Sequence, residues 1–145
     1  SIPEGVTAIG YLWFDGCVSL KGFTLPQSLI EISTQAFKGC SAWDGELNCT
    51  NLSKLQEQAF TNSGITEVKN IGIVTSISVS AFNNCKNLSK VEDEVIARLK
   101  HLRYRAFYNC TSLIIDDLNL PNLETLEQDA FYGVKIKKIS KRFCK

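Results

Sequence analysis

A phenylalanine recurs along this chain of 145 residues at nearly constant intervals, and this recurrence limits the fold more than any other feature. The intervals are 23, 23, 22, 25 and 24 residues, and an alanine precedes five of the six phenylalanines. A unit of this length cannot bury its apolar side chains alone, so it has to stack on copies of itself. The sequence therefore predicts one repeat solenoid over residues 1–145, with about six repeats of 22–25 residues marked by Phe14, Phe37, Phe60, Phe82, Phe107 and Phe131.

Apolar residues recur at fixed distances on both sides of each phenylalanine. They stand eight and five positions before it, as Leu29 and Ile32 do before Phe37, and a second group follows it with the spacing of Leu88 and Val91. One strand per coil, stacked at about 4.8 Å, forms a parallel sheet. We therefore expect a right-handed coil of the leucine-rich-repeat kind. Its parallel β-sheet covers one face, and short strands, turns or single helical turns near the alanine–phenylalanine pairs cover the other.

The second repeat shows the full pattern, in Leu25-Pro26, Leu29, Ile32, Ala36-Phe37 and Cys40. This pattern resembles the BspA-type leucine-rich repeat, and the resemblance covers essentially the whole chain. The sequence departs from it at Trp13 in place of alanine, at Ser63 and Val134 in place of cysteine, and after Cys40, where Trp43 and Leu47 take the apolar places of an irregular strand.

The resemblance implies a secreted or cell-surface protein of bacteria or protists that adheres to host or microbial molecules. It supplies no catalytic residues. The first residues, Ile2-Pro3-Glu4-Gly5-Val6, match a later repeat position at Leu25-Pro26-Gln27-Ser28-Leu29, so we expect the natural protein to be longer than this segment.

The six cysteines indicate packing rather than metal chemistry. Four occupy the position three residues after the phenylalanine, and Ser63 and Val134 occupy it in the other two repeats, so the position selects a small buried side chain. The close cysteine pairs of a zinc site are absent. Cys49 and Cys144 lie outside this position, and a disulfide that involves either residue remains open.

Other groups that could carry chemistry lack the required partners. The only histidine, His101, lies between Lys100 and Leu102 and is interpreted as a surface side chain. The acidic runs Glu92-Asp93-Glu94 and Asp116-Asp117 lack the spacing of a calcium loop and are interpreted as solvated loops. We therefore predict that the chain is not an enzyme, with no catalytic residues, no cofactor and no metal.

The charge and the hydropathy of the chain limit the classes of partner that we expect. The net charge of +1 gives no long-range attraction to nucleic acid, and no apolar run reaches the roughly 20 residues of a membrane helix. Six of the eleven residues from 135 to 145 are basic. We interpret these lysines and the arginine as side chains that face water and discourage other strands from pairing with the last strand. The alternative is a contact to a glycan or an acidic partner.

The remaining candidates for function are the side chains that point outward from the predicted strands. The leading hypothesis is a non-catalytic, extracellular recognition and adhesion module for a protein or glycan ligand, and the alternative is a passive spacer that presents another domain. Alternation around the apolar strand residues predicts a partner-binding surface made of Thr24, Glu67, Lys69, Lys90, Glu92 and Lys138.

Overall fold

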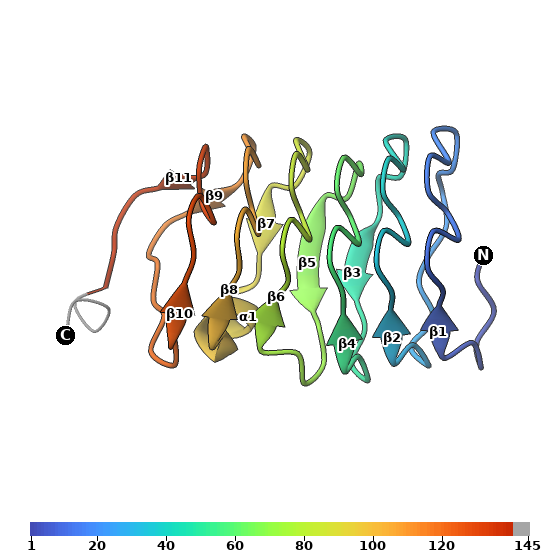
Figure 1. Cartoon of the computed structure of the whole chain (residues 1–145), viewed down its shortest axis with the longest axis horizontal. Coiled ribbons are helices and arrows are strands. Elements are labelled where there is room, and N and C mark those ends of the chain that lie inside the picture. The colour runs from blue at the N-terminus through green and yellow to red at the C-terminus, as the bar shows by residue number, and fades with distance from the viewer. Residues whose placement is uncertain (141–145) are drawn as a thin grey trace.

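The computed structural model describes residues 1–140, which form a solenoid of stacked coils. The coils follow one another along the long axis, and the first and last described segments lie at opposite ends of the stack (Figure 1). Each coil turns once per repeat, so residues about 23 positions apart become neighbours in space. The predicted parallel-strand solenoid is therefore confirmed.

A first ladder of short parallel strands contains the apolar residue that lies five positions before each phenylalanine. Ile9 pairs with Ile32, and Ile32 pairs with Leu55, so equivalent repeat positions lie side by side. These strands form two sheets, in the orders β1-β2-β4 and β6-β8-β10. Their bounds are β1 Ala8–Ile9, β2 Glu31–Ile32, β4 Lys54–Leu55, β6 Ser76–Ile77, β8 His101–Leu102 and β10 Thr125–Leu126.

A second ladder contains the strands that follow each phenylalanine. It forms the sheets β3-β5-β7 and β9-β11, with Val68 in register with Leu47 on one side and Val91 on the other. The strand after Cys40, predicted to be irregular, pairs in parallel with β5 and has Leu47 inward, and its register shifts at an irregularity between Leu47 and Asn48. The bounds are β3 Glu46–Asn48, β5 Glu67–Asn70, β7 Lys90–Val91, β9 Ile114–Ile115 and β11 Lys135–Ile136.

Each ladder is interrupted once, and the two interruptions fall at different coil boundaries. Between β4 and β6 the Ser78 hydroxyl, not a backbone N–H, donates to the carbonyl of Leu55 at 2.8 Å. Between β7 and β9 the longest repeat inserts a short helix, α1 (Asp93–Arg98). At each of these boundaries the other ladder stays paired, so the coils remain joined.

Helix α1 corrects the interpretation of the acidic run Glu92-Asp93-Glu94 as a solvated loop. Asp93 and Glu94 form the first turn of this helix, where carboxylates are favourable near the exposed N–H groups. Val95 and Ile96 in the next turn are buried. The segment is helical because it has its own apolar side chains to place against the coil.

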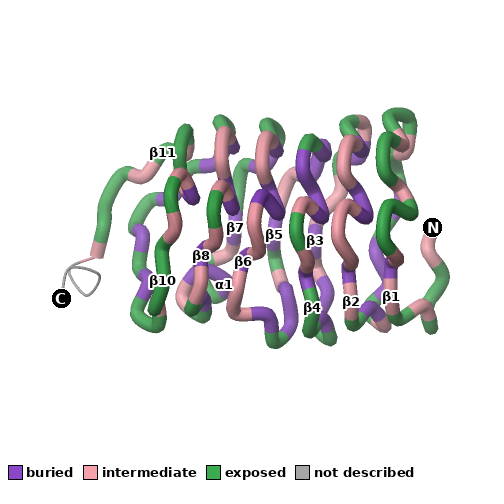
Figure 2. The backbone as a smooth tube through the Cα atoms, viewed as in Figure 1, coloured by how far each residue is buried: buried purple, intermediate pink, exposed green. Residues whose placement is uncertain are grey.

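The six phenylalanines form a continuous column of stacked rings. Neighbouring ring centroids are 5.2 to 5.8 Å apart, and the planes of successive rings differ by no more than 8°. The alanines before them are 0 to 2% exposed, so the backbone of each coil approaches the next without a bulky side chain between. Trp43 and Phe23 extend the column in the first two repeats, with ring centroids 4.8 Å apart. Buried residues are concentrated in the middle coils, whereas the first and last coils are mostly half-buried or exposed (Figure 2).

In three repeats the cysteine position joins a coil to the one before it. The thiols of Cys40, Cys85 and Cys110 each lie 3.0 Å from the carbonyl oxygen of a phenylalanine one coil earlier. Cys40, Cys85, Cys110 and Ser63 are buried, which agrees with a packing position. Cys49 is also buried, and all five cysteines of residues 1–140 are free thiols, whereas Cys144 lies outside the described residues.

Candidate functional site

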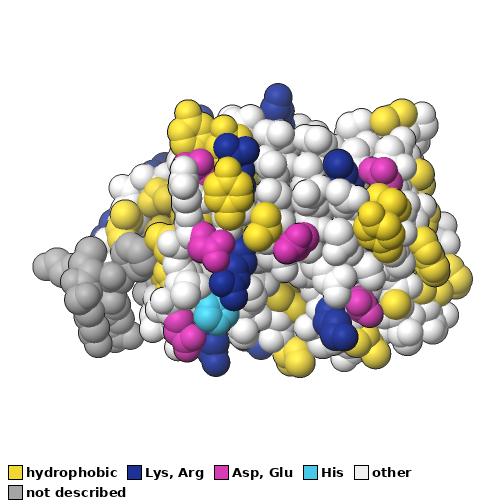
Figure 3. Space-filling view, viewed as in Figure 1, with side chains coloured by type: hydrophobic (Ala, Val, Ile, Leu, Met, Phe, Trp, Pro, Cys, Tyr) yellow, Lys and Arg dark blue, Asp and Glu magenta, His cyan; other side chains and the backbone are white. Residues whose placement is uncertain are grey.

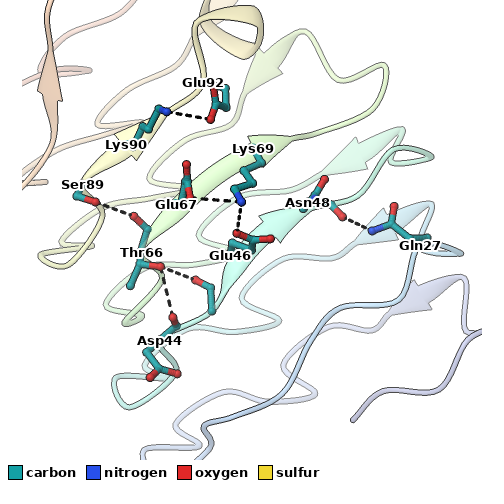
Figure 4. A network of polar contacts seen from close by, with 11 residues as sticks. Gln27, Asp44, Glu46, Asn48, Thr66, Glu67, Lys69, Ser89, Lys90 and Glu92 are labelled. Atoms are coloured by element: carbon teal, nitrogen blue, oxygen red, sulfur yellow. Dashed lines mark hydrogen bonds and ion pairs between the residues drawn. The ribbon is translucent and has the colours of Figure 1, made fainter.

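The second ladder brings four of the six predicted surface residues together. Glu67 and Lys69 lie on β5, Lys90 lies on β7, and Glu92 follows β7 directly. Because Val68 and Val91 between them are buried, the charged side chains on either side point away from the core. Figure 4 shows these side chains on the outer face of β3, β5 and β7, and we call this face the charged surface.

Lys69 is the centre of the charged surface. Its Nζ lies 2.9 Å from a carboxylate oxygen of Glu46 on β3 and 3.8 Å from one of Glu67 on β5. The hydrogen bond to Glu46, and then the negative charges of Glu46 and Glu67, raise the pKa of Lys69 above its ordinary value. Lys90 pairs with Glu92 at 3.2 Å on the neighbouring strand. Both lysines therefore stand among carboxylates, in a pattern of mixed charge across three coils.

Glu46 is a member of this surface that the sequence interpretation missed. It precedes Leu47, and an inward leucine at that position implies that its neighbour faces outward. The signal was present, but the strand was expected to be irregular. Two uncharged side chains, Gln27 and Thr66, lie beside the charged surface (Figure 4). The Gln27 amide donates to the Asn48 carbonyl at 2.6 Å, and the Thr66 hydroxyl lies 3.3 Å from the Asp44 carbonyl.

Thr24, the fifth predicted residue, lies at the border of the charged surface and not within it. It lines a cleft of about 510 Å³ beside β3, together with Phe23, Asp44, Glu46 and Thr66. No strand of the first repeat pairs with β3 on this side among the described residues. The cleft therefore lies beside an unpaired strand edge.

Lys138, the sixth predicted residue, lies farther along the stack. Its Nζ is 3.7 Å from Asp117, and the neighbouring Lys137 pairs with Asp116 at 3.1 Å. Between these residues and β7 lies a second cleft of about 700 Å³, at the interruption that α1 produces. Its lining combines apolar and charged side chains, among them Lys90, Asp93, Ile96, Ile114, Asp116 and Lys137.

The remaining groups considered from the sequence do not join this surface. His101 lies on the first ladder, where its Nδ1 is 2.8 Å from the Thr125 hydroxyl and its Nε2 is 3.6 Å from Glu124. In residues 1–140 no three His, Cys, Asp or Glu side chains gather closely enough to hold a metal ion. Of the basic residues from 135 onward, Lys135, Lys137 and Lys138 are exposed, and residues 141–145 lie outside the described structure. No helix of the described part is long and apolar enough to cross a membrane.

Burial sets the state of the cysteine thiols. It raises the pKa of Cys40 and of Cys49 to about 11. It also raises the pKa of Cys85 well above its ordinary value, with Cys110 next to it. These thiols are protonated at neutral pH, and a protonated thiol is a poor nucleophile and a poor metal ligand.

Comparison with known proteins agrees with this architecture. The BspA type leucine rich repeat region model matches six copies, over residues 1–114 and 94–142. Among solved structures, the chain is similar to a leucine-rich repeat protein from Bacteroides ovatus, with 26% sequence identity and a TM-score of 0.69 over 97% of this chain. This chain spans 39% of that protein, and no curated protein matches it in sequence. The chain belongs to the BspA-type leucine-rich repeat family.

Proposed function

We propose that this chain is a non-catalytic recognition module of a secreted or cell-surface protein, and that it binds a protein ligand through the charged surface. The family to which the chain belongs supports a module for protein interaction. A solenoid presents an extended face along its stack, and such faces are the usual binding surfaces of repeat proteins. The sole histidine contacts only exposed groups and the buried thiols are protonated, which favours recognition over catalysis.

The observation that carries the proposal is the arrangement of Glu46, Glu67, Lys69, Lys90 and Glu92 across three strands. The Lys69 and Glu46 side chains are 40% and 41% exposed. Exposed ion pairs of this kind stabilise a fold by only about 0–1 kcal/mol, so the fold alone does not account for their gathering. Alternating charges select a partner of complementary pattern and steer its approach.

The mixed sign of the charges favours a protein over a polyanion as ligand. Nucleic acids and sulfated glycans bind where basic side chains are in excess. Here three carboxylates accompany two ammonium groups. Two clefts flank the charges, and the exposed Ile114 in one of them offers apolar area to a partner.

The test is a binding screen of the isolated chain against purified extracellular-matrix proteins and a glycan array, followed by charge reversal on the best ligand. The double variant Lys69→Glu/Lys90→Glu should weaken binding by about tenfold or more. The control variant Lys54→Glu/Lys100→Glu makes the same change at two exposed lysines near the first ladder and should bind like the parent chain.

Three outcomes contradict the proposal. Equal losses in both double variants would show that net charge, and not this surface, governs binding. Saturable binding to glycans without a protein ligand would assign the surface to carbohydrate. The absence of any saturable ligand would leave the passive spacer as the better interpretation.

A further inference from the structure

Arg105 is enclosed by aromatic rings at the alanine–phenylalanine turns, a region separate from the charged surface. Its guanidinium carbon lies 4.9 Å from the ring centroid of Tyr104 and 4.5 Å from that of Tyr108. Tyr108 in turn stacks on Tyr132 of the next coil, with centroids 5.0 Å apart and planes 14° from parallel. Two rings therefore lie at cation–π distance from the guanidinium, and a third ring stacks on one of them. We call these four residues the tyrosine–arginine cluster.

The repeats themselves show that packing does not require this cluster. The position directly after the phenylalanine is tyrosine only in the last two repeats, and in the others it is Asp15, Lys38, Thr61 and Asn83. The position two residues before the phenylalanine, where Arg105 stands, accepts leucine, glutamine, serine and aspartate elsewhere. All six coils stack in the same way whatever these residues are. The cluster is therefore a local addition to a fold that forms without it.

The guanidinium of Arg105 has unused hydrogen-bonding capacity. Within residues 1–140 it donates no hydrogen bond, and its single ion pair, to Asp129, is loose at 3.9 Å. Its Nε, which faces Asp129, is buried without a hydrogen-bond partner, whereas the side chain as a whole is 37% exposed. By contrast, the neighbouring Arg103 is engaged by Glu127 at 3.0 Å. Of the two arginines, Arg105 thus presents free donors in a fixed orientation.

The surface around Arg105 is open and partly apolar. Tyr132 is 61% exposed and Tyr104 is 37% exposed. Figure 3 shows hydrophobic and charged side chains gathered on this side of the molecule, toward the C-terminal half of the stack. Tyrosine and arginine are the residue types that dominate binding energy at protein interfaces.

We propose that the tyrosine–arginine cluster is a second binding site, which takes the carboxylate of an aspartate or glutamate on a protein partner. The two Nη groups of Arg105 match the two oxygens of a carboxylate, and the rings hold the fork in place before the partner arrives. Tyr132 covers the apolar part of the bound segment. Asp129 balances the charge of Arg105 from the Nε side, at a distance of 3.9 Å, and leaves the two Nη groups to the partner's carboxylate.

The test is an NMR titration of the ¹⁵N-labelled chain with a blocked acidic peptide that contains three glutamates and one phenylalanine. The expected result in the parent chain is a saturable shift of the Arg105 Nε–Hε signal and of nearby backbone amide signals. The dissociation constant measured from the backbone amides should rise about tenfold in Arg105→Gln. Arg105→Lys should be nearly as weak, because lysine keeps the charge but lacks the planar fork. A peptide with glutamines in place of the glutamates should leave the signal in place.

Controls separate this site from a general effect of charge. Lys38→Gln removes a positive charge from the same side of the second repeat and should bind the peptide like the parent chain. Lys69→Glu/Lys90→Glu should also bind the peptide normally, so a failure of the charged surface is distinguishable from a failure here. The dispersed amide spectrum of each variant reports its fold.

Two results would overturn the proposal. One is equal peptide affinity in the parent chain and Arg105→Gln, including the case in which neither binds. The other is a saturable shift with glucuronic acid or a sulfated disaccharide but none with the acidic peptide, because the cluster would then bind glycans.

Discussion

The Sγ atom of Cys85 lies 3.0 Å from the carbonyl oxygen of Phe60, one coil earlier. The same carbonyl also accepts the backbone N–H of Ser63 at 3.0 Å. The contact recurs from Cys40 to Phe14 and from Cys110 to Phe82. A cysteine that could be taken for a metal ligand from the sequence is thus a hydrogen-bonded link between coils. This link requires the protonated thiol, because only the protonated form donates a hydrogen bond.

The buried thiols make stability depend on alkaline pH. Their pKa is raised in the folded chain, to about 11 for Cys40 and Cys49, from 9.0 for a free thiol. The unfolded chain therefore loses these protons first as the pH rises. The stabilisation is complete below pH 9 and declines between about pH 9 and 11, by at most about 1.4 kcal/mol per pH unit for each thiol.

Urea unfolding from pH 8 to 11 measures this dependence. The variant Cys40→Ser/Cys49→Ala should be less stable at pH 8, but its free energy of unfolding should fall less steeply above pH 9. Parallel curves for the two proteins would show that the thiols do not carry the effect.

The stacked rings predict a large cost for removing one from the middle of the column. Phe60 is fully buried, with the rings of Phe37 and Phe82 at 5.3 and 5.5 Å on its two sides. Phe60→Ala should lower the free energy of unfolding by about 3–5 kcal/mol through the cavity it leaves. Phe131→Ala should cost less, because Phe131 is only partly buried and stacks on one described ring. A loss below about 1 kcal/mol for Phe60→Ala, measured by urea unfolding, would refute the packing role.

Two glycines of similar backbone conformation allow the cost of backbone strain to be measured separately from the cost of a steric clash. Gly72 and Gly22 have φ values of +61° and +69°, which side chains other than glycine rarely adopt. A Cβ at Gly72 would overlap the carbonyl oxygen of Leu52 and lie 2.6 Å from its nitrogen, whereas a Cβ at Gly22 meets nothing within 4 Å. Gly22→Ala should therefore lose about 1–2 kcal/mol from strain alone. Gly72→Ala should lose clearly more, and equal thermal unfolding of the two variants would contradict the close approach at Leu52.

Much of this architecture could be read from the sequence because one position defines the rest of each coil. Once the phenylalanines are aligned, the inward residues follow by counting, and the outward residues Glu67, Lys69, Lys90 and Glu92 follow from the buried Val68 and Val91. The counting holds wherever a repeat keeps its length. Counting did not predict that the first ladder, as well as the second, consists of paired parallel strands, because a two-residue strand has no periodicity of its own.

The features that the sequence did not predict arise where repeats depart from one another. Helix α1 occupies extra residues of the longest repeat. Ile96 takes the same buried position as Ile71 in the coil before, whereas the position of the buried Val95 is taken by the half-buried Asn70 there. Glu46 escaped because its strand was expected to be irregular. The enclosure of Arg105 depends on the directions of side chains in turns of adjacent coils, which spacing along the chain does not encode.

The most direct test of the central claim, that recognition occurs on the outer face of β3, β5 and β7, is carbodiimide footprinting of carboxylates with and without a ligand from the binding screen. The ligand should slow modification of Glu46, Glu67 and Glu92, whereas Glu31 and Glu124, which lie along the first ladder, should react at unchanged rates. Protection of Glu31 or Glu124 without protection of Glu46, Glu67 and Glu92 would contradict it.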